Sequence, residues 1–377
     1  MAIIAAILGA GLVLWVLWEG FETIVLPRRV TRRFRLTRLF YRRTWIPWAN
    51  MVGSFVPAGS RETWLSVFGP LSLLLLMIIW VVGLILGFGL LHWSLGPALL
   101  TREGIAGFFS DFYLSGTTFF TLGLGDVAPQ GTLARLLVVI ESGMGFGFLA
   151  LVIGYLPVLN QSFARREVSI SLLDARAGSP PTASEMLRRH DHEGGMEALQ
   201  ELLHEWERWS SDLLEGHLSY PVLAYFRSQH DNESWLAALT AVLDTCALVM
   251  AGLDGASERQ AELTFARARH AVVDLSLVFR TEPGEPKPAR LSPERLAKLR
   301  ALLAASGLKL RKGEAVDQRL TELRHLYEPY VHALAAYFRV AIPPWIAAAG
   351  WVDNWQKTAW ERPAKKIFRE RGKRGHF

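Results

Sequence analysis

The sequence predicts an all-α membrane protein whose second half is a helical cytoplasmic domain, and three observations support this fold class. Long uncharged apolar runs are confined to the first 160 of the 377 residues. The remainder is charged, rich in Ala and Leu, and patterned with the period of amphipathic helices. No segment of that remainder alternates apolar and polar residues as a half-buried strand does. A chain of this length has room for two or three domains.

Three apolar runs are long enough to span a membrane, since roughly 20 residues cross the hydrocarbon core. They are Ala2–Leu26, about Trp64–Trp93 and about Thr132–Leu159. The first lacks the basic start and the small-residue cleavage site of a secretory signal, so we expect residues 1–26 to remain as an N-terminal transmembrane helix. A fourth apolar piece, Ile105–Phe120, contains Asp111 and is too short to span.

The arginines between the first two runs predict the orientation of the chain. They are Arg28, Arg29, Arg32, Arg33, Arg35, Arg38, Arg42 and Arg43. Because basic residues beside spans favour the cytoplasm, residues 27–63 are expected to form a basic cytoplasmic loop lying on anionic membrane lipids. The net charge of +6 therefore favours lipid rather than nucleic acid as a partner. The N-terminus is then outside, and the C-terminal domain is cytoplasmic, in a multi-pass protein of the cell (inner) membrane.

The stretch "TTFFTLGLGD", residues 117–126, suits neither a helix nor a strand. Glycine weakens both elements, and an Asp in an apolar setting is costly to bury. Placed between two spans, the stretch is expected to be irregular backbone that enters the membrane from outside and returns. Such backbone survives at membrane depth only where it is buried in protein or lines a watery path. Glycines at alternate positions allow successive carbonyls to face one axis, where a dehydrated cation can pair with them.

On these residues, the segment resembles the selectivity filter of tetrameric potassium channels, in which backbone carbonyls replace the hydration shell of the ion. Thr121–Asp126, "TLGLGD", carries the resemblance. Tyr113–Phe120 stands where the pore helix of that family lies, and Pro129 ends the outer turn. The third apolar run follows as the inner helix. The resemblance covers residues 64–160, which it identifies as the pore domain.

The resemblance implies roles for individual residues. Potassium ions, rather than any cofactor, would be held by backbone carbonyls of the filter, with the hydroxyl of Thr121 at its inner end. The implied filter residues are Thr121, Leu122, Gly123, Leu124 and Gly125. Asp126 would support the filter from outside, together with Thr117 and Thr118 of the pore helix. One filter per chain cannot encircle an ion, so the resemblance implies a homotetramer.

Two positions depart from the pattern of that family. Leu124 replaces the usual Tyr or Phe, and Phe120 replaces the usual threonine before the filter. The aromatic side chain normally packs behind the filter and fixes its diameter. Because selectivity depends on how firmly the carbonyls are held, this departure leaves open a relaxed selectivity that admits sodium.

The inner helix contains the glycine-rich stretch "ESGMGFGF", residues 141–148. Gly145 falls where the resemblance implies a gating hinge. The alternative is close helix packing through Gly143 and Gly147, because small residues four apart let helices approach. Pro157 is expected to bend the end of the helix, with the constriction of the pore near Tyr155–Val158.

Glu141 lies inside the third run, where an ionisable side chain is costly unless it is paired. We expect it to face the pore helix and to bond near Thr117 or Thr118, as part of the support of the filter. The alternative is that it lines the cavity and attracts cations.

The cytoplasmic half, residues 161–377, carries helical patterns with linkers near 175–184 and 281–292. The helices are expected at about 196–214, 233–253, 256–280, 293–306 and 314–341. The cluster "HDHE", His190–Glu193, is expected to be a solvated turn, with a metal or pH-sensing site as the alternative. The single cysteine, Cys246, is expected to be a core residue. No pattern in this half assigns a gating ligand.

The function that these features predict is passive potassium transport, gated by inner-helix movement coupled to the cytoplasmic domain. One alternative is a non-selective monovalent cation channel. Another is a membrane-anchored sensor or scaffold with a vestigial pore. The chain is not expected to be an enzyme, because it has no nucleophile elbow, metal-binding HExxH or phosphate loop.

Overall fold

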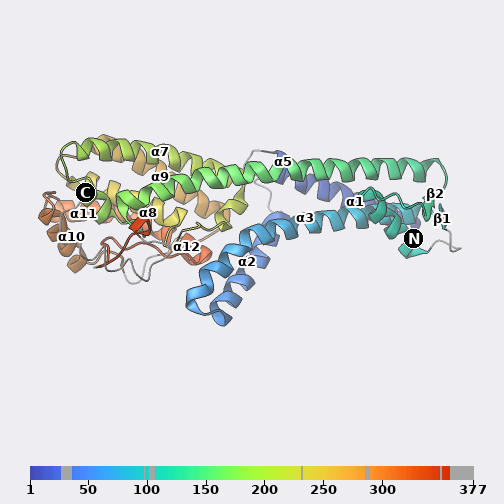
Figure 1. Ribbon diagram of the computed structural model, residues 1–377, viewed down its shortest axis with the longest axis horizontal. Helices are drawn as coiled ribbons and strands as arrows, with labels where there is room; N and C mark the ends of the chain where they lie inside the picture. Colours follow the sequence, from blue (N-terminus) through green and yellow to red (C-terminus); the bar gives the residue numbers. More distant parts are fainter. Residues whose placement is uncertain are drawn as a thin grey trace. The chain divides into compact units, whose positions relative to one another are not determined.

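The computed structural model describes residues 1–26, 36–96, 98–101, 107–230, 232–284, 289–348 and 350–356. The described chain is predominantly helical, which confirms the all-α fold class (Figure 1). It forms two compact units. Unit 1 comprises Met1–Ser162 and Ser219–Phe226, and unit 2 comprises Phe163–Leu218 and Arg227–Phe377. Of the arginines in the expected basic loop, those at 28, 29, 32, 33 and 35 lie outside the described residues.

Unit 1 contains the helices that are long and apolar enough to cross a membrane in the first half of the chain. The elements are α1 (Ala2–Gly20), the π-helical turn η1 (Phe21–Val25), α2 (Leu36–Phe55), η2 (Ala58–Ser60), α3 (Arg61–Ser94), β1 (Leu99–Thr101), α4 (Phe108–Phe119), β2 (Val127–Pro129) and the first part of α5 (Thr132–Ala177). The candidate spans Ala2–Val25, Ala58–Ser94 and Thr132–Ala177 include the three runs expected from the sequence.

Helix α1 packs closely along α3 through small residues, side by side as drawn in Figure 1. A Cβ atom built at Gly9 would lie 2.6 Å from the carbonyl oxygen of Gly87. A Cβ atom at Gly83 would lie 2.9 Å from a methyl group of Val16. Glycines of this kind let backbones approach where lipid offers no hydrophobic drive to association. The first span is thus packed against the second, and is not an isolated anchor.

The expected loop 27–63 contains a helix, α2, over Leu36–Phe55. Its buried face includes Tyr41 and Trp45, which join an aromatic cluster. Tyr225, from the later segment Ser219–Phe226, stacks on Tyr41 with ring centroids 5.2 Å apart and meets Trp45 edge-on at 5.4 Å. The sequence reading missed this helix because arginines interrupt its apolar pattern, although its buried face packs against α3.

Unit 2 is built around α8 (Trp235–Gly252). Its other elements are the end of α5, α6 (Ala183–Arg189), α7 (Gly195–Ser219), α9 (Glu258–Phe279), α10 (Pro293–Ala305), α11 (Glu314–His325), α12 (Glu328–Phe338) and η4 (Asn354–Gln356). Helix α8 is also long and apolar enough to cross a membrane. However, 89% of its apolar window is buried inside the protein, and α9, α11 and α12 pack against it, so it is the core helix of unit 2.

The predicted helices of unit 2 match the observed ones closely except at the end. The single helix expected over 314–341 is two helices, α11 and α12, which meet at Leu326–Tyr327. Pro329 explains the break, because a proline favours the first turn of a new helix. Thr182 caps α6 by accepting a hydrogen bond from the backbone of Glu185, as its position before the helix predicts.

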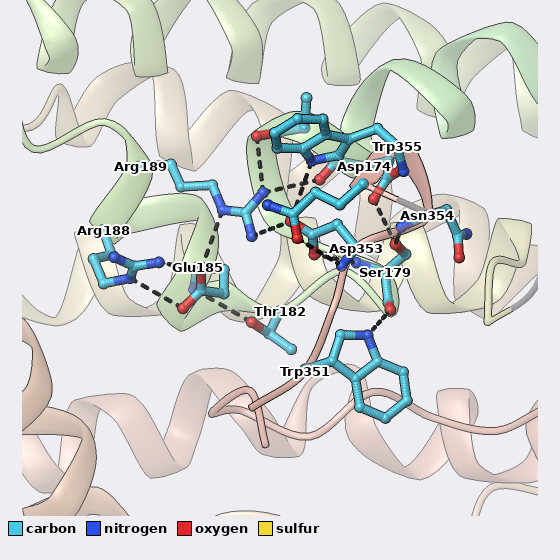
Figure 2. Close-up of polar contacts among 12 residues, drawn as sticks. Asp174, Ser179, Thr182, Glu185, Arg188, Arg189, Trp351, Asp353, Asn354 and Trp355 are labelled. Atoms are coloured by element: carbon cyan, nitrogen blue, oxygen red, sulfur yellow. Dashed lines mark hydrogen bonds and ion pairs between the residues drawn. The ribbon is translucent and has the colours of Figure 1, made fainter. Parts of the chain in front are cut away.

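The last described segment of unit 2 binds the end of α5 through a polar network (Figure 2). Arg189 donates to Asp353 at 2.8 Å and to the carbonyl oxygens of Asp174 and Ala175 at 3.1 and 2.9 Å. Asp174 also accepts from the backbone of Trp355 at 2.9 Å. The end of the long α5 helix is therefore tied to a segment nearly 180 residues later, within the same unit.

Candidate functional site

The segment after α4 has a backbone that alternates in conformation. Thr121, Gly123 and Gly125 have positive φ angles of 57°, 58° and 74°, whereas Leu122 and Leu124 do not have positive φ. The left-handed region costs an L-residue roughly 1–2 kcal/mol, which glycine avoids. Thr121 adopts it without that advantage. The alternation is the one expected of a segment whose successive carbonyls face one side.

Helix α4 holds the beginning of this segment. The N–H of Thr121 donates to the carbonyl oxygen of Thr118 at 2.9 Å, and the N–H of Leu122 donates to that of Thr117 at 2.8 Å. Among the residues that the structure describes, no donor pairs with the carbonyl oxygens of residues 121–125. Since buried or ligand-facing carbonyls need a partner, these oxygens are the groups of the segment that can take one from outside the chain.

The outer end of the segment is fixed by two further contacts. The hydroxyl of Tyr113, on α4, donates to the carboxylate of Asp126 at 2.8 Å. Directly after Asp126, strand β2 pairs with β1 in an antiparallel sheet, with Leu99 opposite Pro129. These contacts tie the C-terminal end of the segment to α4 and to the strand that follows α3.

Helix α5 approaches the inner end of the segment through Gly145. A Cβ atom built there would lie 2.1 Å from the carbonyl oxygen of Phe119, the last residue of α4. Residues Gly143 and Gly147 have no atom within 4 Å of a built Cβ in the single chain. Helix α5 continues without a break through Gly145 and Pro157. In this structure Gly145 is therefore a close-packing position against the pore helix, and the expected packing through Gly143 and Gly147 is not made within one chain.

Comparison with known proteins bears on the same segment. Residues 73–160 match the family model described as ion channel. The chain contains an ion-channel domain. This confirms the family resemblance of the pore region, and it points to a channel rather than an enzyme.

A curated relative supports the membrane location. The chain is similar to the uncharacterized membrane protein YdjJ of Bacillus subtilis (strain 168), with 30% identity over 190 residues. The match covers 50% of this chain and 54% of the relative, so the chain spans about half the length of the relative it matches. No solved structure matches the chain.

Inside the ion-channel domain, Glu141 of α5 is fully buried and joins three helices. Its Oε2 atom lies 3.0 Å from Nε2 of His92 on α3, and its Oε1 atom bonds the hydroxyl of Ser115 on α4. It thus faces the pore helix, as expected, and does not line the cavity. Its partner there is Ser115 rather than Thr117 or Thr118. The hydroxyl of Thr117 donates instead within its own helix, to the carbonyl oxygens of Tyr113 and Leu114, both at 3.0 Å.

The two departures from the potassium-channel pattern lie at exposed positions of the ion-channel domain. Leu124 is 61% exposed in the single chain. Phe120 is 58% exposed and meets Phe119 edge-on, with ring centroids 5.5 Å apart. The hydroxyl that holds Asp126 comes from Tyr113, thirteen residues earlier in the chain.

Outside the ion-channel domain, the residues His190–Glu193 do not converge. No cluster of three His, Cys, Asp or Glu side chains that could hold a metal occurs in the described part of the chain. His190 is buried and its Nδ1 atom bonds the carbonyl oxygen of Met186 at 2.7 Å, whereas His192 is exposed. The expected solvated turn is therefore wrong for His190, because that side chain completes the end of α6. Cys246 is fully buried on α8, as expected.

Sequence reasoning missed His92, Ser115 and the strand pair β1–β2 that follows Asp126. A signal for His92 was present, because an ionisable residue in an apolar span needs a buried partner just as Glu141 does. Ser115 carries no such signal, since a serine in a helix usually bonds its own backbone. The strands have three residues each, too short for alternation to reveal.

Proposed function

We propose that the protein is a potassium channel in which four copies of the chain surround one pore. The observation that carries the proposal is the filter segment, where alternate positive φ angles accompany five carbonyl oxygens with no donor in the described chain. Carbonyl oxygens in that arrangement can replace the water around a monovalent cation. One chain supplies one quarter of the ring, so a cyclic homotetramer is the assembly that completes it.

Potassium is the proposed ion because the filter keeps the glycines and the Asp of the family pattern. A second candidate is a non-selective monovalent cation channel, favoured by the exposed Leu124. Without an aromatic residue behind the filter, the spacing of the carbonyls rests on the contacts at its two ends. The Tyr113–Asp126 bond and the β1–β2 pair supply such contacts at the outer end.

Ion flux through the purified full-length protein in liposomes tests the function. A potassium gradient should drive uptake of a tracer cation, and reversal potentials in opposed potassium and sodium solutions should follow potassium. A reversal potential near zero would instead support the non-selective channel. Silence across pH, voltage and calcium, together with a monomer by mass measurement, would contradict both and leave a scaffold role.

For orientation, we propose that the N-terminus lies outside and unit 2 in the cytoplasm, on the arginine-rich segment between α1 and α3. Cysteine-accessibility labelling of Cys246→Ser protein carrying a new cysteine at Ala2 or at Glu193 tests this. An impermeant reagent applied to whole cells should label the first position and not the second. The reverse pattern would overturn the orientation.

For gating, we propose that opening is controlled through the inner end of α5 by the segment Ser219–Phe226. The ring of Tyr220 lies edge-on to Tyr155 of α5, with centroids 5.7 Å apart. The same segment is anchored by Tyr225 in the aromatic cluster of α2 and α3, and by Phe226 against Gly69. Both ends of the segment Ser219–Phe226 continue into unit 2. A conformational change in unit 2 can therefore displace Tyr220 and, through it, Tyr155, which lies near the expected constriction.

A double-mutant cycle tests this coupling. Tyr155→Leu and Tyr220→Leu should each change the open probability, and the double variant should show about the effect of one, since aromatic pairs couple by about 0.5–1.5 kcal/mol. Fully additive effects would contradict a direct role of the pair. Phe279→Leu is the control, because that aromatic residue packs against Phe338 inside unit 2.

A further inference from the structure

Three helices of the ion-channel domain meet at one buried polar site, formed by Glu141, His92 and Ser115. The hydrogen bonds among these side chains need more protons than the hydroxyl of Ser115 alone can supply. Glu141 and His92 have no exposed side-chain area, and Ser115 is also fully buried. The hydroxyl of Ser115 lies 2.8 Å from the carbonyl oxygen of Ile85 and in hydrogen-bond contact with Oε1 of Glu141. A hydroxyl has one proton to donate, but it has lone pairs with which to accept.

The two neighbours of the Ser115 hydroxyl decide where a proton must be. The carbonyl oxygen of Ile85 can only accept, so Ser115 donates to it. If Glu141 were ionised, its Oε1 atom would also only accept, and one proton would face two acceptors at a site without water contact. If Glu141 carries a proton on Oε1, it donates that proton to the hydroxyl of Ser115, and Ser115 still donates its own proton to the carbonyl oxygen of Ile85. Oε2 then accepts from Nε2–H of His92 at 3.0 Å.

We propose that Glu141 is held in its protonated form and acts, with His92 and Ser115, as a positioning group that fixes the pore helix beneath the filter. The proposal rests on the proposed channel function only for its effect on ion flow. Ser115 lies two residues before Thr117, whose carbonyl oxygen holds the N–H of Leu122 at 2.8 Å. The protonated carboxyl group thus connects the inner helix α5 and the outer helix α3 to the turn of α4 that carries the filter.

Two further titratable atoms lie on the helices of this site. On α4, Asp111 is buried, and its Oδ1 atom has no hydrogen-bond partner in the described structure. On α3, Nδ1 of His92 likewise has none. On helix α1, residues Ala2–Gly9 include no titratable side chain, and Gly9 approaches Gly87 of α3. With His92 neutral and Glu141 protonated, no charge is left buried between Glu141 and His92.

Infrared difference spectroscopy of the full-length protein tests the protonation state without reference to ion flow. The wild-type spectrum minus that of Glu141→Gln at neutral pH should show the C=O stretch of a protonated carboxylic acid. Glu193→Gln is the control, because Glu193 is exposed and its difference spectrum should show a carboxylate instead. A carboxylate band for Glu141 would overturn the proposal even if the protein conducts potassium.

Flux in liposomes tests the positioning role. Glutamine reproduces the protonated acid, with one donor for Ser115 and one acceptor for His92, so Glu141→Gln should keep potassium flux and selectivity within about twofold. Glu141→Leu should lower selective flux by about tenfold or more, because it removes the hydrogen bonds to both Ser115 and His92. Raising the pH far enough to remove the infrared band should lower flux similarly in the wild type but not in Glu141→Gln. Equal losses in the Gln and Leu variants, or a wild-type pH response retained by the Gln variant, would overturn the positioning role, whereas silence of all variants would contradict the channel function itself.

Discussion

The two units treat their buried or unpaired polar groups in opposite ways. In unit 2, the guanidinium of Arg290 bonds both carboxylate oxygens of Asp244, at 3.1 and 2.6 Å, and one of Glu328 at 3.0 Å. In unit 1, the carbonyl oxygens of residues 121–125 have no donor in the described chain. Both arrangements are costly to assemble. The charged groups of Arg290, Asp244 and Glu328 are paired within the chain, although Nε of Arg290 has no hydrogen-bond partner in the described structure, and such pairing indicates a structural role. Carbonyl oxygens that are left open indicate a partner from outside.

The same contrast extends to the backbone. Around Arg290 in unit 2, the charged groups sit on regular helices or beside them, and Tyr327 donates to Asp244 at 2.5 Å. Burial and the neighbouring carboxylates raise the pKa of Tyr327, so its proton stays in that bond. In unit 1, the open carbonyls lie on the strained backbone of Thr121–Gly125. Strain of this kind is retained where the surrounding structure holds it for a function.

The largest predicted effect is the loss of potassium flux when Gly123 of the proposed filter is replaced. Gly123→Ala places a side chain at a φ of 58°, which costs roughly 1–2 kcal/mol in each subunit, or roughly 4–8 kcal/mol in a proposed ring of four. Potassium flux in liposomes should therefore fall more than about a hundredfold. Gly131→Ala is the matched control, because Gly131 has a φ of 81° outside the filter and nothing within 4 Å of a built Cβ. Equal loss of flux in both variants would show that strain alone, rather than the filter, is being tested.

The next prediction concerns the free energy of unfolding when the ionic network around Arg290 in unit 2 is disrupted. Arg290→Met leaves Asp244 and Glu328 buried without their shared cation, so unfolding should become easier by about 3–5 kcal/mol. The measurement is thermal or urea unfolding of the full-length protein in detergent. Arg311→Met is the control, because the Arg311–Asp254 pair is at least half exposed and should be worth less than about 1 kcal/mol. Similar losses in the two variants would contradict the structural role of the network.

The difference between the units also explains what the sequence could predict. The ion-channel domain was predictable because the glycines, Thr121 and Asp126 form a local pattern whose chemistry depends on the backbone, and residues 73–160 match an ion-channel family model. The spans and most helices of unit 2 follow from length and period. Helix α2 and the segment Ser219–Phe226 were not predictable, because their places depend on aromatic contacts such as that between Tyr41 and Tyr225, which lie far apart in the sequence. For the same reason, Glu141 could be assigned a need for partners but not the partners themselves.

A smaller effect, on the preference for potassium over sodium, is expected at the outer end of the proposed filter. Tyr113→Phe removes only the hydroxyl that donates to Asp126, a hydrogen bond to a charged group in an exposed position. The preference for potassium over sodium, read from reversal potentials, should fall by about fivefold to tenfold if this bond holds the outer carbonyls in place. Expression and thermal unfolding should not change. An unaltered preference would show that the β1–β2 pair alone is sufficient to fix that end of the filter.

The smallest effect concerns His217, a buried group of unit 2 that is satisfied in only one protonation state. Its Nδ1 atom bonds the carbonyl oxygen of Leu213 at 2.7 Å, and Arg166 lies 3.5 Å from Nε2. Burial and the charge of Arg166 lower the pKa of His217 from 6.5 to about 3. Because the unfolded chain then binds the proton more readily, the stabilising contribution of His217 is fully present above pH 6.5 and falls as the pH drops toward 3.

Between pH 7.5 and 5.5 the full-length protein should lose about 1–2 kcal/mol of unfolding free energy through His217. His217→Gln should reduce that loss. His204→Gln should not, because His204 is 58% exposed. An unchanged pH dependence in His217→Gln would instead assign the acid sensitivity to other groups such as His190 or His332, whose pKa values are also lowered by burial.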